Sequence, residues 1–178
     1  MSEYKYQQSN NPIKRSTHCL IKHPSLGERL RVGEPCSGMG LGGLYMYIPQ
    51  NIIDELISQA RQDAPNETCG YLLGTRGADG VALVTENYWM ENIDHSPEHF
   101  SFAPKDQFAA LRYARSKGLK LLANWHSHPA SPSRPSQEDL RLANDPTIRY
   151  AILSLHQGVH LNSFKILNGE VVDKQEHL

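Results

Sequence analysis

The sequence has little net charge, few cysteines and no long apolar run, and each absence removes a class of protein. Its 178 residues carry a formal net charge of −1, which gives no electrostatic case for nucleic-acid binding. No apolar stretch approaches the ~18 residues that a membrane-spanning helix needs. The polar N-terminus, M-S-E-Y-K-Y-Q-Q-S-N-N, lacks the apolar segment of a signal peptide. We therefore expect a soluble protein with neither a membrane nor a nucleic-acid partner.

The cysteines are too few and too irregularly spaced to form a disulfide framework. Cys19, Cys36 and Cys69 are an odd number, and no pair of them makes a Cys-x-x-Cys zinc pattern. Such cysteine usage fits a reducing compartment, so we predict a cytoplasmic location. We interpret Cys69, which lies in an apolar run, as a core residue rather than a nucleophile.

The composition changes along the chain and predicts three parts. Residues 1–43 are predicted to be a partly flexible N-terminal extension, because they begin polar and end in the glycine-rich C-S-G-M-G-L-G-G. Residues 44–170 have the patterned apolar residues of a compact domain, and residues 171–178 are predicted to be a C-terminal tail. Gly42-Gly43 has two interpretations, a plain glycine linker or an internal mimic of a substrate that ends in Gly-Gly.

Apolar periodicity places helices and strands alternately along residues 44–170. We predict helices over 49–63, 104–117 and 137–144. We predict strands over 44–48, 69–74, 81–90, 100–102, 119–125, 149–156 and 160–167. This order indicates an α/β fold, a mixed β-sheet flanked by helices.

Two histidines follow the predicted strand 119–125 and are the first candidates for chemistry. His126 and His128 are two residues apart, so in an extended chain their side chains point to the same face. Pro129 then ends the strand, and a loop with Pro132 and Pro135 leads to the next helix. The spacing suits two ligands of one metal ion.

The helix after this loop supplies a third candidate ligand. Asp139 lies in its first turn, where the helix dipole favours a carboxylate that can turn back towards the strand end. Two imidazoles, one carboxylate and an open fourth position are typical of a catalytic zinc site. The alternative is that Ser136 and Asp139 only cap the helix. The two interpretations are compatible, because the cap can hold the aspartate in place.

This pattern resembles a known motif. His126-Ser127-His128-Pro129, followed by Ser136 and Asp139, is similar to the JAMM motif of MPN-domain zinc metalloproteases. An earlier segment, E-T-C-G-Y-L-L-G from Glu67, resembles the glutamate-bearing strand of that family. Asn92, Ser96-Pro97, Phe100 and Pro104 resemble the connecting segment of its prokaryotic members. The likeness covers roughly residues 48–167 and implies the MPN fold, a cytidine-deaminase-like α/β sandwich.

The resemblance also implies a mechanism. One Zn²⁺ would be held by His126, His128 and Asp139, and it would lower the pKa of a bound water from about 15.7 to near 7. Glu67 would be the general acid and base, with a pKa raised by burial. The Ser136 hydroxyl would stabilise the oxyanion, and such a donor is worth roughly 2–4 kcal/mol.

The family cleaves peptide or isopeptide bonds at the C-terminus of ubiquitin-like proteins. The prokaryotic type implies a sulfur-carrier protein as substrate, cut after its Gly-Gly end, with an E1-like activating enzyme in the same pathway. One alternative is a deubiquitinase-like isopeptidase acting on lysine conjugates, and another is a non-catalytic MPN scaffold. A zinc deaminase is disfavoured, because it needs His-x-Glu and Pro-Cys-x-x-Cys, which the sequence lacks.

The remaining histidines are weaker candidates. Pro97 separates His95 from His99 and indicates a loop, so we interpret them as surface or substrate-loop residues rather than metal ligands. His156 and His160 flank a predicted hairpin turn and are interpreted as structural. Trp125 is expected to pack beneath the site.

Overall fold

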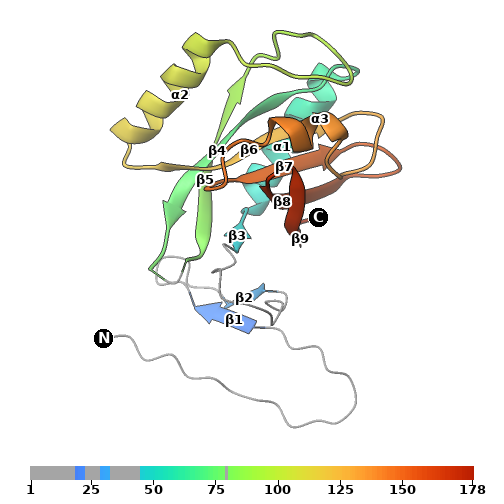
Figure 1. Cartoon of the computed structure of the whole chain (residues 1–178). Helices are drawn as coiled ribbons and strands as arrows, with labels where there is room; N and C mark the ends of the chain where they lie inside the picture. The colour runs from blue at the N-terminus through green and yellow to red at the C-terminus, as the bar shows by residue number, and fades with distance from the viewer. Residues whose placement is uncertain (1–18, 23–28, 33–44, 79) are drawn as a thin grey trace, which may run out of the picture. The chain divides into compact units, whose positions relative to one another are not determined.

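The structure is a computed structural model that describes residues 19–22, 29–32, 45–78 and 80–178 (Figure 1). The chain divides into two units, residues 1–41 and 42–178. In the first unit, β1 (Cys19–Lys22) and β2 (Arg29–Val32) pair antiparallel. The expectations for Cys36 and for Gly42-Gly43 fall outside the described residues.

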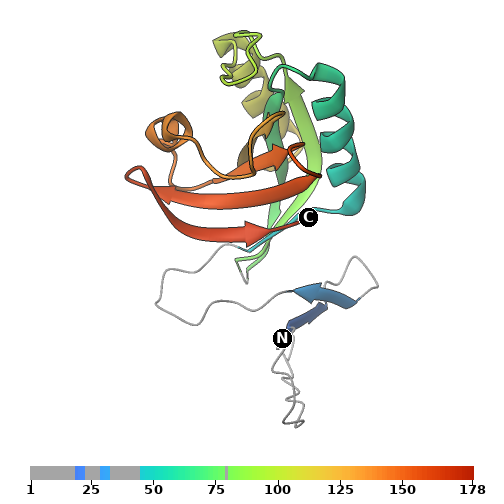
Figure 2. The same ribbon diagram turned by 90° about the vertical axis from the view of Figure 1, so that its right-hand side faces the viewer.

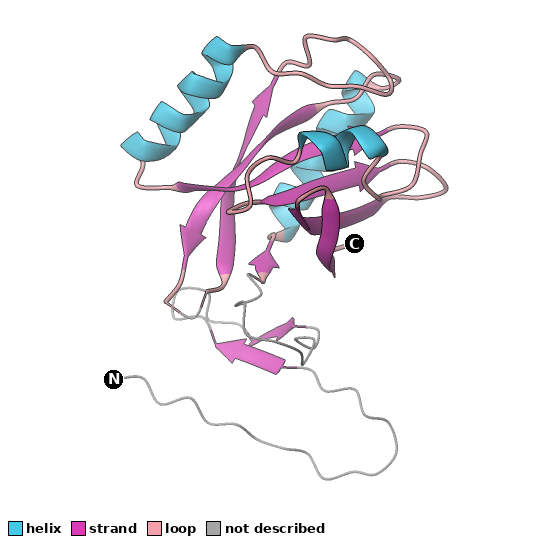
Figure 3. Ribbon diagram, in the orientation of Figure 1, coloured by secondary structure: helices cyan, strands magenta, loops and turns pink. Residues whose placement is uncertain are grey.

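The second unit is built on one seven-stranded mixed sheet, shown with its helices in Figure 3. The strand order is β3-β5-β4-β6-β7-β8-β9, and all neighbours are antiparallel except the pairs β3/β5 and β6/β7. The strands are β3 (Met46–Tyr47), β4 (Cys69–Arg76), β5 (Ala82–Met90), β6 (Lys120–His128), β7 (Arg149–Ser154), β8 (His160–Leu167) and β9 (Glu170–Glu176).

The sheet curls, so that its two edge strands come together (Figure 2). The Met46 N–H on β3 donates to Gln175 Oε1 on β9 at 2.9 Å, and Gln175 Nε2 donates back to the Met46 carbonyl at 2.5 Å. A side-chain amide thereby takes the place of a backbone ladder between the two edges. This contact limits the exposure of unpaired strand edges, which otherwise favour aggregation.

Three helices accompany the sheet. These are α1 (Gln50–Asp63), α2 (Pro104–Ser116) and α3 (Gln137–Leu142). The apolar face of α1 that the sequence predicts is buried, with Ile52, Ile53, Leu56 and Ala60 packed against Leu72, Leu122 and Trp125. On the other face, Ala110 and Ala114 of α2 pack with Tyr71 and Leu73. The predicted α/β fold, a mixed sheet flanked by helices, is confirmed.

Two local predictions are wrong. Residues 171–178, predicted to be a tail, contain most of β9, which pairs with β8 along its length. Residues 100–102, predicted to be a strand, form none. Their aromatic rings contact side chains instead, since Phe102 packs edge-on against Tyr71 and Phe100 stacks on His126.

Among the described residues, no helix is long and apolar enough to cross a membrane.

The C-terminal strand also neutralises a buried cation. The Arg149 side chain is only 4% exposed, and its Nη1 lies 2.7 Å from Asp173 Oδ2 on β9. Its other guanidinium nitrogens donate to Ser163, through Nε to Oγ and through Nη2 to the backbone carbonyl. Asp173 thus supplies the carboxylate of an ion pair with this buried cation.

We therefore predict that Asp173→Ala lowers the free energy of unfolding by about 1–3 kcal/mol, because the buried Arg149 side chain loses its ion pair with Asp173. The matched control is Glu176→Ala on the same strand, where Glu176 pairs with Lys174 at the surface. It should cost under about 0.5 kcal/mol, as exposed ion pairs do. Urea denaturation of both variants measures the difference, and equal effects would contradict this account of Arg149.

Candidate active site

The two histidines lie at the end of β6, a central strand paired with β4 on one side and β7 on the other. His126 and His128 are 3% and 5% exposed, and their Nε2 atoms are 3.0 Å apart. The intervening Ser127 faces the other side, where its Oγ accepts the Thr68 N–H at 3.0 Å. Trp125 also lies on that side, buried in the core beneath the site. Strand alternation alone therefore aims both imidazoles at one point.

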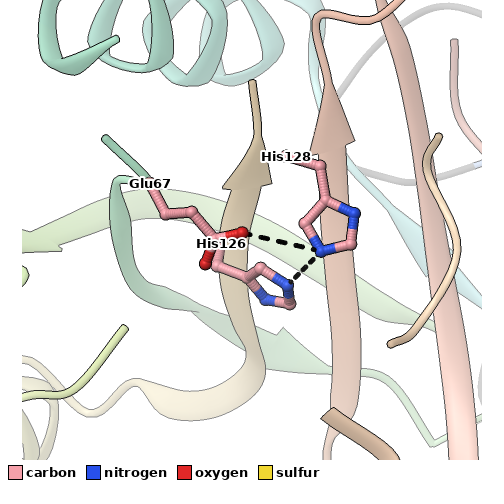
Figure 4. A group of neighbouring side chains, drawn as sticks. All are labelled: Glu67, His126 and His128. Atoms are coloured by element: carbon pink, nitrogen blue, oxygen red, sulfur yellow. Dashed lines mark hydrogen bonds and ion pairs between the residues drawn. The ribbon is translucent and has the colours of Figure 1, made fainter. Parts of the chain in front are cut away.

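Glu67 reaches the same point from the residues that precede β4 (Figure 4). It is 4% exposed, and its Oε1 lies 3.8 Å from His128 Nε2. Both of its backbone polar groups are bonded, the N–H to the Ser96 carbonyl and the C=O to Asn92 Nδ2. Among the described residues, Glu67, His126 and His128 form a group whose possible ligand atoms all lie within 4.8 Å of one another.

Asp139 faces the histidines from the first turn of α3. Its Oδ1 is 3.3 Å from His126 Nε2, and its Oδ2 is 3.6 Å from His128 Nε2. The same carboxylate completes a capping box, in which Oδ2 accepts both the N–H and the hydroxyl of Ser136 at 2.7 Å. In return, Ser136 Oγ accepts the Asp139 N–H. The cap thus holds the carboxylate that faces the imidazoles, and the two interpretations of Ser136 and Asp139 describe one arrangement.

The separations between these atoms fit a single small cation. A tetrahedral zinc ion with ligands at about 2.0–2.1 Å keeps the ligand atoms about 3.3 Å apart. The Nε2 atoms and the Asp139 oxygens are separated by 3.0, 3.3 and 3.6 Å. His128 also carries its proton on the correct nitrogen, because Nδ1 donates to the Pro132 carbonyl at 3.0 Å and leaves Nε2 free to coordinate.

Burial and mutual charge decide the protonation of these groups. Burial raises the pKa of Glu67 to about 8, since the nearby His128 only partly offsets the loss of hydration and Asp139 adds to the rise. Burial would also raise the pKa of Asp139, but the facing imidazoles of His126 and His128 and the Ser136 hydroxyl hold it well below its usual range. The two carboxylates therefore differ. Asp139 stays ionised as a ligand should, while Glu67 can exchange a proton near neutral pH.

The two histidines also differ from each other. Burial lowers the pKa of His126, and the hydrogen bond with Asp139 offsets this only in part. Burial acts on His128 in the same direction, but bonds to Asp139 and the Pro132 carbonyl, with Glu67 nearby, raise its pKa overall. A dication at this point would favour the neutral imidazoles and ionised carboxylates that coordination requires.

A cleft of about 330 Å³ opens beside these groups. It is lined by Glu67, Ser136 and Asp139 together with residues of the connecting segment, 91–103, which joins β5 to α2. His99 Nδ1 contacts Glu138 Oε2 at 2.5 Å and joins that segment to α3. His99 therefore belongs to the wall of the cleft. His95 lies at the surface, with Nε2 3.9 Å from Glu91.

The other candidates are not part of this cluster. His156 and His160 flank the turn between β7 and β8. The Cys69 thiol is fully buried, and burial raises its pKa to about 12, so it stays protonated. Sequence reasoning placed Asn92 only by resemblance and gave it no role. Its contacts with distant backbone groups have no local sequence signal.

The family described as "Prokaryotic homologs of the JAB domain" matches residues 49–167, two thirds of the chain. The chain belongs to this family. The JAMM/MPN resemblance is thereby confirmed.

The chain is also similar to individual proteins. A "CysO-cysteine peptidase" of Mycobacterium tuberculosis is 27% identical over 131 residues, covering 72% of this chain and 88% of the relative. A "Probable TtuB-protein conjugate cleaving protease" of Thermus thermophilus is 33% identical over 109 residues, covering 61% and 69%. A solution structure from Desulfitobacterium hafniense superposes with a TM-score of 0.67 at 43% identity, covering 74% and 90%.

We predict that the purified protein holds about one zinc ion per chain, measured by elemental analysis. His128→Ala should retain less than a tenth of that zinc, and chelation should lower the melting temperature of the wild type, because a ligand bound only to the folded state stabilises it. His160→Ala, which removes an exposed imidazole from the β7–β8 turn, is the control and should retain full zinc. Equal zinc contents in the two variants would contradict the assignment.

Proposed function

We propose that this protein is a zinc-dependent peptidase or isopeptidase that hydrolyses the bond after the Gly-Gly end of a ubiquitin-like sulfur-carrier protein. The observation that carries the proposal is the convergence of His126, His128 and Asp139 with Glu67 in one buried cluster beside an open cleft. Relatives named as a CysO-cysteine peptidase and a TtuB-conjugate protease support a carrier-protein substrate. We also propose that the protein is cytoplasmic and acts there on such carriers, in the same pathway as an E1-like activating enzyme.

His126, His128 and Asp139 would hold the metal, and Glu67 would stay outside its coordination. When bound, zinc would activate a water molecule and polarise the scissile carbonyl. Glu67 takes a proton from the attacking water and returns it to the leaving nitrogen as the C–N bond breaks. This gives a carboxylate on the carrier and a free amine. Burial, which raises the pKa of this carboxyl above its ordinary value, favours a group that can both accept and donate the proton.

Ser136 lies at the rim of the cleft, where its hydroxyl can donate to the carbonyl oxygen as negative charge develops there. In the structure this hydroxyl donates to Asp139 Oδ2, so it is already positioned beside the cluster. An oxyanion donor acts in the transition state more than in the ground state, so its loss should lower kcat rather than raise KM.

Glu67→Gln is predicted to reduce cleavage by about 10²–10⁴-fold and to keep its zinc, because the amide preserves shape but cannot accept a proton. The substrate is a sulfur carrier extended beyond Gly-Gly by a short tail, and mass spectrometry of the product reports the cut site. A variant that still cleaves at the wild-type rate would remove Glu67 from the mechanism.

Parallel substrates separate the alternatives. Preference for a lysine-linked ubiquitin-like conjugate over the tailed carrier would favour the deubiquitinase-like isopeptidase. A zinc-loaded protein that cleaves neither would favour the non-catalytic scaffold.

Ser136→Ala is predicted to lower kcat by roughly 10²–10³-fold, the cost of a lost oxyanion donor. Because Ser136 also caps α3, Ser136→Thr serves as the matched variant that restores the hydroxyl and the cap. Zinc content is measured in both, so that displacement of Asp139 is recognised. Full activity of Ser136→Ala would assign this serine to capping alone.

A further inference from the structure

Asn92 uses its whole side chain to hold backbone groups around the proposed active site. Its Nδ2 donates to the carbonyls of Glu67 and His99, both at 2.9 Å. Its Oδ1 accepts the N–H groups of Asp94 at 3.1 Å and Ser101 at 3.2 Å. The residue is 8% exposed. One buried amide therefore ties together four positions of the chain, one of them 25 residues away.

The segment that Asn92 organises has no regular structure of its own. Residues 91–103, between β5 and α2, contain no helix or strand. Its residues are exposed or half-buried except Asn92, and the backbone has no ladder of hydrogen bonds to fix it, so bonds from side chains decide its path. Asn92 supplies three such bonds within the segment, and the Ile93 N–H adds one to the Ser101 carbonyl. Asn92 is the buried residue among those that fix the segment, which is also bonded through Ser96, His99 and Ser101.

Glu67 depends on the same segment. It precedes β4, and although the next residue, Thr68, is bonded to Ser127 of β6, the N–H and C=O of Glu67 itself make no bond to a strand. Its N–H bonds to the Ser96 carbonyl, and its carbonyl accepts from Asn92. The N–H and the C=O of Glu67 are thereby both bonded to residues 91–103. A shift of this backbone would move the carboxylate relative to His128, now 3.8 Å away.

The segment also shapes the wall of the cleft. Asn92 fixes His99 and Ser101, the two neighbours of Phe100. The Phe100 ring in turn stacks on His126 with its centroid 4.5 Å from that of the imidazole. Loss of the Asn92 side chain would therefore remove bonds that hold the Glu67 backbone and bonds that hold the Phe100 ring on His126.

We propose that Asn92 is a positioning residue for the hydrolysis, which holds the Glu67 carboxylate in the geometry that proton transfer requires. The inference rests on the proposed function. The Asn92 side chain must be an amide, since its contacts need two N–H donors and an acceptor oxygen at once. Aspartate keeps the volume of the side chain but presents oxygen to the two carbonyls.

The kinetic test compares Asn92→Ala and Asn92→Asp with the wild type on the tailed carrier. We expect kcat to fall by about 10–100-fold, as for other residues that orient catalytic groups, with KM within about threefold and zinc content unchanged. Asp173→Ala is the control, because it loses stability on β9 without touching the segment, and its kcat should not change. Unchanged kcat in both Asn92 variants, or zinc loss equal to the loss of kcat, would overturn the proposal.

Amide hydrogen exchange gives a readout that needs no activity. In the wild type, the Glu67 and Ser101 amides should exchange slowly although neither lies in a helix or strand. In either Asn92 variant they should exchange at least about tenfold faster, while amides in the middle of β4 stay protected. Fast exchange in the wild type, or unchanged exchange in the variants, would overturn the proposal.

The two measurements also separate this proposal from the proposed function. If the wild type cleaves no carrier, the proposed function fails, and the exchange rates still decide whether Asn92 holds Glu67. If the wild type cleaves and the Asn92 variants cleave equally well, only the positioning role is lost.

Discussion

The end of the domain that carries the candidate site depends on one unfavourable grouping, two imidazoles and two carboxylates that are largely buried at the edge of a cleft. Such groups lose hydration on burial and are tolerated only when they are paired or bind a cation. Here they lie beside each other, and two of them are also bonded from outside the cluster, His128 to the Pro132 carbonyl and Asp139 to the N–H and hydroxyl of Ser136. The loops around the site therefore serve mainly to satisfy and orient this cluster, and the sheet beneath supplies the stability that the cluster does not.

Much of this arrangement could be predicted because it follows from local periodicity. A strand alternates its faces, so the spacing of His126 and His128 alone sets both rings side by side. The capping signature at Ser136 likewise depends on residues three apart, and it predicts where the Asp139 carboxylate turns. The apolar face of α1 is another pattern of this kind. Each of these predictions needs only the geometry of one element and no knowledge of its neighbours.

The features that sequence reasoning missed depend on distant partners. Glu170–Glu176 has an unremarkable polar composition, and it becomes a strand because β8 offers an edge and because Arg149 and Met46 need its side chains. Residues 100–102 have the aromatic content of a strand, yet Phe100 and Phe102 gain more by packing on His126 and Tyr71. Three partners of Asn92 lie within nine residues of it, but Glu67 is 25 residues away, and nothing in the sequence around either residue predicts that contact.

The site thus has two halves with different mechanical support. His126 and His128 belong to a central strand with neighbours on both sides, so their positions are tied to the core of the sheet. Glu67 and Asp139 approach from outside the sheet, and the backbones that carry them are linked through residues 91–103 and the contact of His99 with Glu138. Exposed residues of this connecting segment can change the wall of the cleft without moving the histidines. Asn92 differs from these exposed residues, because it is buried and its bonds join the wall of the cleft to the backbone of Glu67.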